Sequence, residues 1–269
     1  MKLYSLQDQK SEATKAKLTD AAKAIIGSYG MKYLTVRNIC EDSGVSTGSF
    51  YHHFKTKENL VSIIMREMFR TVTENNPFPE DITDSSGIGR ILWPFLVYAV
   101  FCEKIGPEAV STLCYECSDD LFEENCFEQG VKDAVRAAFR QGALRRRHGA
   151  DSNADYRAEH SGDIREEGAA DDGSDGTDGS NGWKYRNLYL DLEAIYKGIV
   201  AAWCMDAGRN DAVRSLSDNM LHVLYRFLLS FAADNVRRDL EAEHFLWEFR
   251  KRRGGIDLTG VNVCRDGEE

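Results

Sequence analysis

Side chains that can donate hydrogen bonds are concentrated in one short stretch, residues 46–57, which reads STGSFYHHFKTK. Phe50 and Phe54, four residues apart, would share one face of a helix and leave the hydroxyl and imidazole groups for its other faces. Such groups, together with lysine ammonium groups, donate to phosphates and to base edges, and the small residues would let the backbone approach closely. The pattern is typical of a helix that binds nucleic acid, although an ordinary helical hairpin with a polar outer face has the same pattern.

Two other groupings have the residue types of a metal site, but neither is complete. Cys114 and Cys117, three residues apart on a helix, would suit zinc or a redox switch, yet no second pair and no nearby histidine completes a tetrahedral site. The adjacent His52 and His53 would point about 100° apart on a helix. Because the seven cysteines occur without a secretion signal, we expect free thiols. Because neither grouping is complete, we expect no metal, and we expect no cofactor.

Catalytic spacings are not found in the sequence. It has no G-x-S-x-G elbow, no glycine loop that would cradle a phosphate and no H-E-x-x-H pair. The six histidines and the many carboxylates form no recognisable catalytic arrangement. We therefore expect a protein that is not an enzyme.

Two short helices joined by a turn would position the polar stretch. Thr35 precedes an apolar set and is a good N-cap for a helix over 36–42, which Ser43-Gly44 would end. Ser46 is a natural N-cap for the second helix. This is the organisation of a helix-turn-helix, whose second helix enters a major groove.

Longer amphipathic helices are predicted on either side, over 12–29 and over 57–73. Residues 1–75 hold 8 Lys and 3 Arg against 8 Asp and Glu, a balance of +3. The net charge of the chain is −10, so the remaining residues carry −13. The basic part of the chain is therefore the part predicted to touch phosphate.

Residues 11–75 resemble the TetR family of transcriptional regulators, of the TetR/AcrR helix-turn-helix type. The resemblance rests on the long first helix, on the stretch YGMKYLTVRNICEDSGVSTGSFYHHFKTKENL and on the amphipathic helix that follows it. It implies an all-α fold, with a three-helix DNA-binding head over 11–75 joined to a larger helical effector-binding and dimerisation domain over 88–253. It also implies which residues contact DNA: Thr35, Ser46, Thr47, Gly48, Tyr51, His52, His53 and Lys57.

Two of these positions need comment. Lys57 matches the lysine that opens the connecting helix and meets the DNA backbone. Many relatives carry tyrosine or tryptophan where this chain has His52, so that contact departs from the family pattern.

The rest of the chain is predicted to be helical. Apolar periodicity indicates helices near 88–105, 107–117, 119–144, 188–205, 212–233 and 236–253, with a tail after Gly254-Gly255. Pro94 should kink or restart the first of these helices. In TetR-like proteins such helices enclose a small-molecule cavity. The resemblance therefore implies six candidate pocket residues: Trp93, Tyr98, Phe101, Cys102, Tyr115 and Trp203. The alternative is that these residues only pack in the core.

An acidic insertion interrupts this helical pattern. Residues 151–182 contain 7 Asp and 3 Glu against 2 Arg, a balance of −8. A stretch of this composition cannot bury enough apolar area to offset the entropy of ordering it. We expect a disordered insertion at about 148–182, with an acidic partner-binding loop as the alternative.

The apolar faces over 188–233 predict a helical hairpin that one domain cannot bury alone. By resemblance it forms a homodimer interface, and two-fold symmetry would match a palindromic operator. The sequence has no run of about twenty apolar residues that could span a membrane, so we expect a cytoplasmic repressor that responds to a small molecule. The alternative is a TetR-like protein that acts through protein contacts without specific DNA binding.

Overall fold

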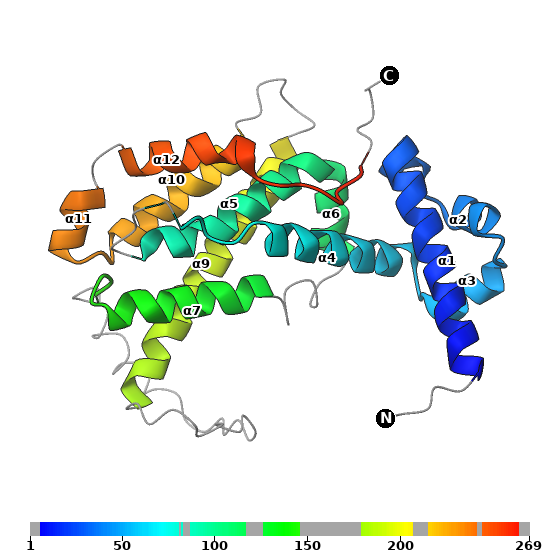
Figure 1. Cartoon of the computed structure of the whole chain (residues 1–269), viewed down its shortest axis with the longest axis horizontal. Coiled ribbons are helices and arrows are strands. Elements are labelled where there is room, and N and C mark those ends of the chain that lie inside the picture. The colour runs from blue at the N-terminus through cyan, green and yellow to red at the C-terminus, as the bar shows by residue number, and fades with distance from the viewer. Residues whose placement is uncertain are drawn as a thin grey trace.

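The computed structural model describes residues 6–80, 82, 87–116, 126–145, 179–206, 215–240 and 244–263. Among these residues every regular element is a helix, and the one isolated β-bridge pairs Leu144 with Ala232. A small head built on α1–α3 stands beside a larger helical body, and α4 runs from one to the other (Figure 1). The predicted all-α fold class is confirmed.

The head and the connecting helix consist of α1 (Leu6–Tyr29), η1 (Met31–Tyr33), α2 (Val36–Ser43), α3 (Thr47–His53) and α4 (Lys57–Asn75). The body consists of α5 (Ile88–Ile105), α6 (Pro107–Glu116), α7 (Cys126–Arg140), α9 (Gly179–Asp206), α10 (Leu216–Leu229), α11 (Asp234–Leu240), α12 (His244–Arg252) and η2 (Arg253–Gly255). None of these described helices is long and apolar enough to cross a membrane.

The head contributes buried side chains from α1, α2 and α3 to the hydrophobic core. Leu18 and Ile26 of α1, Ile39 of α2 and Phe50 of α3 are completely buried, as is Phe54, the C-cap residue of α3. The four-residue spacing of the two phenylalanines therefore places both in this core, as the sequence predicts.

Helix α4 joins the head's part of the hydrophobic core to the body's part. Its first half, with Leu60 and Ile64, is buried with the head, and its second half meets α5 of the body. There the Phe69 ring lies 5.3 Å from the rings of both Tyr98 and Phe101. The helix that carries the head is thus in direct contact with α5 at these aromatic residues.

Helix α5 forms the centre of the body and packs against α7 and α10. The helix continues through Pro94 without a break, so it is not restarted there. Tyr196 of α9 closes the packing from the other side, with its ring 5.4 Å from that of Phe95.

Several predicted helix boundaries are wrong, and the single helix predicted over 236–253 is two helices, α11 and α12. Two of the wrong boundaries have a clear local cause. Helix α7 ends at Arg140, because Gly142 adopts a left-handed φ of 71° and turns the chain into the bridge between Leu144 and Ala232. Helix α10 begins at Leu216 instead of 212, because the Ser215 hydroxyl accepts a hydrogen bond from the Asp218 amide and caps the helix.

The acidic insertion lies mainly outside the described residues. This applies to 148–178, whereas 179–182 fall in the first turn of α9.

The chain beyond Gly255 is not a free tail. Residues 256–263, hereafter the strap, fold back along α4 towards α1, as the red segment after α12 shows in Figure 1. Ile256, Val261 and Val263 are all buried, with exposed fractions of 8%, 3% and 8%. The prediction failed because the apolar residues are few and are interspersed with glycine and polar residues.

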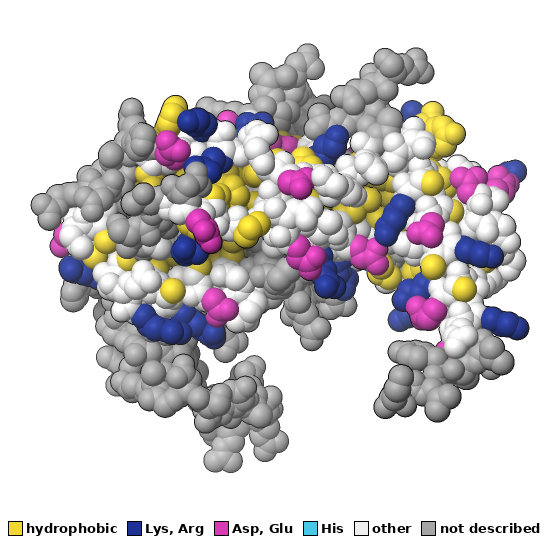
Figure 2. Space-filling model, viewed as in Figure 1, with side chains coloured by type: hydrophobic (Ala, Val, Ile, Leu, Met, Phe, Trp, Pro, Cys, Tyr) yellow, Lys and Arg dark blue, Asp and Glu magenta, His cyan; other side chains and the backbone are white. Residues whose placement is uncertain are grey.

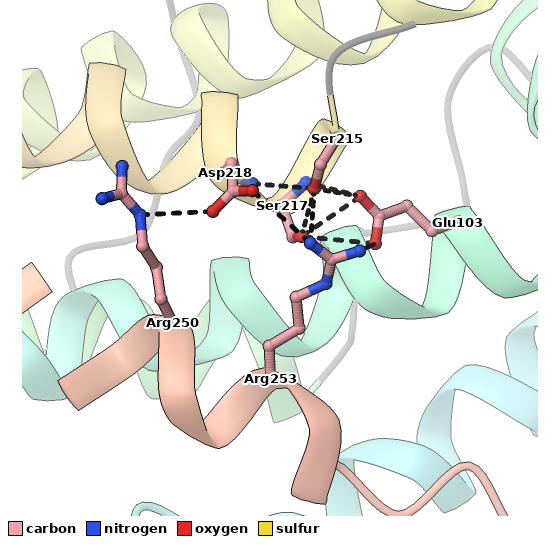
Figure 3. A network of polar contacts seen from close by, with 6 residues as sticks. All are labelled: Glu103, Ser215, Ser217, Asp218, Arg250 and Arg253. Atoms are coloured by element: carbon pink, nitrogen blue, oxygen red, sulfur yellow. Dashed lines mark hydrogen bonds and ion pairs between the residues drawn. The ribbon is translucent and has the colours of Figure 1, made fainter. Parts of the chain in front are cut away.

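A polar network joins the end of α5 to the start of α10 and to η2. One carboxylate oxygen of Glu103 accepts hydrogen bonds from the Ser217 amide at 2.9 Å and from the Ser215 hydroxyl at 2.8 Å. The Arg253 guanidinium donates to the Ser215 hydroxyl at 2.9 Å and forms an ion pair with Glu103 at 3.4 Å. Figure 3 shows the whole network: Glu103, Ser215, Ser217, Asp218, Arg250 and Arg253.

Candidate nucleic-acid interface

The turn between α2 and α3 is built by two capping side chains and one glycine. The Thr35 hydroxyl accepts a hydrogen bond from the Asn38 amide at 3.1 Å, and the Ser46 hydroxyl accepts one from the Ser49 amide at 3.2 Å. Gly44 ends α2 in the left-handed region, with a φ of 66°. Both predicted caps and the predicted stop are confirmed.

The caps leave the two hydroxyl groups with a further function. A serine or threonine hydroxyl that accepts a hydrogen bond from a backbone amide still has its own proton to donate. Thr35 and Ser46 are both exposed, so each can hold its helix and donate to an anion from outside at the same time. A phosphate oxygen is the acceptor that such a donor at a helix N-terminus favours.

The outer face of α3 is polar and accessible. Thr47, Gly48, Tyr51 and His52 are exposed, with the Tyr51 residue 55% exposed, and His53 is half-buried. The edge of the Tyr51 ring packs on buried Phe50, with the ring centroids 5.3 Å apart. This contact restricts the side chain, so the phenol hydroxyl is presented to solvent without the full entropy cost of a free side chain.

Gly48 keeps the first turn of α3 thin. A Cβ atom added there would have one neighbour within 4 Å, the Ser46 hydroxyl oxygen at 4.0 Å. The position is therefore open on its outer side, where a flat surface could approach the backbone.

Lys57 is half-buried and forms an ion pair with Glu58, its Nζ lying 3.6 Å from a carboxylate oxygen. Partly exposed ion pairs of this kind contribute little to the stability of the fold, because water screens their charges. The ammonium group is therefore free to exchange this carboxylate for a stronger anionic partner.

Sequence reasoning missed three further residues on the head. Arg37 of α2 is highly exposed and donates to Glu41 at 2.8 Å; this hydrogen bond and the carboxylate charge raise the pKa of the guanidinium further. The four-residue Arg37–Glu41 spacing was the available signal. Tyr29 and Tyr33 form an exposed pair with ring centroids 6.0 Å apart, for which the sequence pattern gave no signal.

Basic and acidic side chains are interspersed over the face of the head seen in Figure 2. The Lys23 ammonium lies 2.6 Å from a carboxylate oxygen of Glu67, so part of the head's positive charge is neutralised within the protein. The basic side chains on this face of the head are therefore interspersed with acidic ones and form no single basic patch.

The six candidate pocket residues do not form one group. Tyr98 and Phe101 pack together on Phe69, and Cys102 is buried in the same core. Trp93 lines a different place, a groove of about 650 Å³ between the residues after α4 and α12. Trp203 is half-buried in α9; Tyr115 lies in α6, but its side chain is outside the described part of the chain.

The cysteines at described positions are thiols. Cys40 and Cys102 are buried, and Cys204 is half-buried. Burial raises the pKa of the Cys204 thiol, although a hydrogen bond with Ser111 opposes the shift. Cys117 lies outside the described residues, as does the side chain of Cys114, so the predicted pair is untested.

Comparison with known proteins identifies the head. Residues 18–63 match the family described as bacterial regulatory proteins, tetR family. Over 50 residues the chain is 40% identical to the HTH-type transcriptional repressor KstR2 of Mycolicibacterium smegmatis, a match that covers 19% of this chain and 24% of that protein. It is 30% identical over 63 residues to the HTH-type transcriptional regulator UidR of Escherichia coli, covering 23% and 32% of the two chains.

These matches span about a quarter to a third of the length of the relatives. A solved structure of RolR in complex with the ligand resorcinol aligns over 87% of this chain and 96% of its own, with 13% identity and a TM-score of 0.47. The matching relatives are transcription regulators, in agreement with the prediction that the chain is not an enzyme.

Proposed function

We propose that the chain is a DNA-binding transcription regulator, and a repressor as its relative KstR2 is, because residues 18–63 match the tetR family of bacterial regulatory proteins. The observation that carries the proposal is the division of α3, whose buried Phe50 and following Phe54 fix it in the head while its other faces stay polar and open. In this proposal residues 11–75 read DNA, and residues 88–253 bind an effector and a second subunit.

Each predicted contact has a part in the proposed complex. Tyr51 and His52, with Thr47 and the thin backbone at Gly48, would enter the major groove, where hydrogen-bond donors and acceptors distinguish base pairs. His53 would lie at the edge of this contact, because it is half-buried. The hydroxyl protons of Thr35 and Ser46 and the ammonium of Lys57 would bind phosphates and set the register.

A homodimer through residues 188–233 is part of the proposal. Leu190 and Met205 of α9 are about half exposed, at 47% and 57%, and Phe227 and Leu229 of α10 are only partly buried in the single chain. Apolar side chains left in this state on two neighbouring helices favour burial against a second copy. Two heads related by two-fold symmetry would then read a palindromic operator.

The contact between α4 and α5 offers a route for an effector to act. Phe69 of α4 packs on Tyr98 and Phe101, two of the candidate pocket residues. A small molecule that displaces either ring would shift α4 and, with it, the spacing of the two heads.

Binding to the intergenic DNA beside the protein's own gene tests the proposal. Titrations in a salt series should show specific binding that weakens as salt rises, because lysine contacts neutralise phosphates and release their condensed counterions. Tyr51→Ala should weaken the specific complex more than binding to unrelated DNA, whereas Lys57→Ala should weaken both. If the wild-type chain binds no DNA specifically, with or without effectors, the protein acts instead through protein contacts.

A further inference from the structure

The strap, residues 256–263, touches both the body and the head, and it is anchored in three places. The first anchor lies just before it, at Arg253 of η2. This guanidinium donates to the Ser215 hydroxyl at 2.9 Å and pairs with Glu103 at 3.4 Å, which ties the strap's origin to α10 and α5 (Figure 3). The exit of the strap from the body is therefore set by a charged and partly buried contact, which is not expected of a free tail.

The second anchor is an amide that holds the strap as a neighbouring strand would. Asn76, the C-cap of α4, accepts a hydrogen bond from the Asp257 amide and donates one to the Asp257 carbonyl, each at 2.8 Å. The same Asn76 donates to the Val72 carbonyl at 2.7 Å and accepts from the Trp93 indole at 2.9 Å. One side chain and its backbone thus join the end of α4, the body and the strap.

A tight turn then directs the strap towards the head. The Thr259 amide donates to the Asp257 carboxylate at 2.8 Å, and the Val261 amide donates to the Leu258 carbonyl at 3.0 Å. Gly260 has a φ of 90°, and a Cβ there would lie 3.7 Å from the Thr71 methyl group. A residue with a side chain would be strained in this conformation, so Gly260 allows the close passage over α4.

The third anchor is on the head itself. Val261 and Val263 are buried, while Asn262 between them is exposed. The two valines therefore lie on the buried side of the strap. The strap meets α1 at Asn262, whose carbonyl oxygen and Cβ lie 3.4 and 3.5 Å from the position that a Cβ would occupy at Gly27.

We propose that residues 256–263 are a brace that fixes the head at one angle to the body, with Arg253, Asn76 and the Gly27 contact as its anchors. Helix α4 alone would leave the head to swing as the helix bends, whereas a second connection running beside α4 removes that freedom. Only the effect of the brace on DNA binding rests on the proposed function: a fixed angle would hold two heads at the spacing of their operator half-sites.

Two pairs of variants of the full chain test the brace without DNA. Val261→Asp puts a charge at a buried position of the strap, and Asn262→Asp puts the same charge on the neighbouring exposed side chain. Gly27→Leu pushes on the strap from the head, whereas Gly27→Ala adds a methyl group that the 3.4 Å gap accommodates. Hydrogen exchange of peptides over 256–263 should rise at least tenfold in Val261→Asp and Gly27→Leu and stay within threefold of wild type in the two controls.

Exchange over α5 and α10 reports whether the body remains folded, and it should not change in either releasing variant. If Val261→Asp unfolds the chain, Gly27→Leu decides alone, because leucine is a better helix former than glycine and leaves the body untouched. Strap peptides that already exchange as fast as an unfolded peptide in the wild-type chain would overturn the proposal.

Operator titration gives the second readout. Both releasing variants should bind the operator at least tenfold more weakly than their controls. Released straps with unchanged operator affinity would refute the brace. A wild-type chain that binds no DNA would instead refute the proposed function, and the exchange data would still decide whether the strap holds the head.

Discussion

Replacing Gly48 with glutamate should separate DNA binding from stability, because the two effects have opposite signs. Gly48 is the second residue of α3, after the N-cap Ser46 and Thr47. Glutamate is a better helix former than glycine by about 0.5–1 kcal/mol. A carboxylate in the first turn also interacts favourably with the helix dipole, by roughly 0.3–1 kcal/mol. The nearest atom to the new Cβ is the Ser46 oxygen at 4.0 Å, so packing should not oppose either gain.

The same carboxylate should strongly oppose DNA binding. A phosphate about 6 Å away repels it by roughly 0.7 kcal/mol in water and about 3 kcal/mol at a partly desolvated surface. Each head should therefore lose about 1–3 kcal/mol, or roughly 5- to 150-fold in affinity. Two heads on one operator would lose the product of the two factors.

Thermal unfolding and fluorescence anisotropy with an operator duplex provide the two measurements. Gly48→Glu should melt at or above the wild-type temperature and bind the operator at least about 25-fold more weakly. Gly48→Gln adds the same bulk without the charge, and Gly48→Ala adds a methyl group alone, so the three variants separate charge, bulk and helix propensity. Wild-type affinity in Gly48→Glu would refute the proposed approach of α3 to DNA, and a lower melting temperature would refute the reasoning on stability.

Four further predictions concern the head, the strap and a thiol. Phe54→Ala removes a fully buried ring and should destabilise the chain by about 3–5 kcal/mol in denaturant titrations, while Phe54→Leu should cost much less. Thr35→Ala should cost about 1 kcal/mol through the lost cap and also weaken DNA binding, and Thr35→Ser should restore both. Hydrogen bonds from Thr259 hold the pKa of the Asp257 carboxyl group below its ordinary 3.8. The contribution of this carboxylate to strap docking should therefore be complete above about pH 4 and be lost as the pH falls through the lowered pKa. Hydrogen exchange of the strap at acid pH would reveal the loss. Since burial raises the pKa of Cys204 above its ordinary 9.0, iodoacetamide should label it more slowly than a free cysteine at pH 7.5, and equal rates would contradict the burial.

The head could be predicted from the sequence because its structure is decided locally. Thr35 and Ser46 precede short apolar patterns, and Gly44 stands where a left-handed residue is needed, so caps and stop are readable without knowledge of the fold. The exposure of α3 followed from the same periodicity. The exposed state of Tyr29 and Tyr33 did not, because it depends on which neighbours leave those rings uncovered.

The body was less readable because its details depend on distant partners. The start of α10 is set by Ser215, which is shared with Glu103 and Arg253, 112 and 38 residues away. Pocket walls and core use the same residue types, so nothing in the sequence distinguished Trp93, beside a groove, from Tyr98, packed on Phe69. The strap was missed because its docking rests on a few buried side chains and on one asparagine.

The hydrogen bond between the Trp93 indole and the Asn76 carbonyl gives the protein an internal optical reporter. Trp93 is one of four tryptophans and is 6% exposed, and its bonding partner also holds the strap. Trp247, by contrast, is already half exposed. If the hydrogen bonds of Asn76 break, water would reach the Trp93 indole and shift its fluorescence emission to the red. Docking of the strap can therefore be followed by fluorescence in an unlabelled chain.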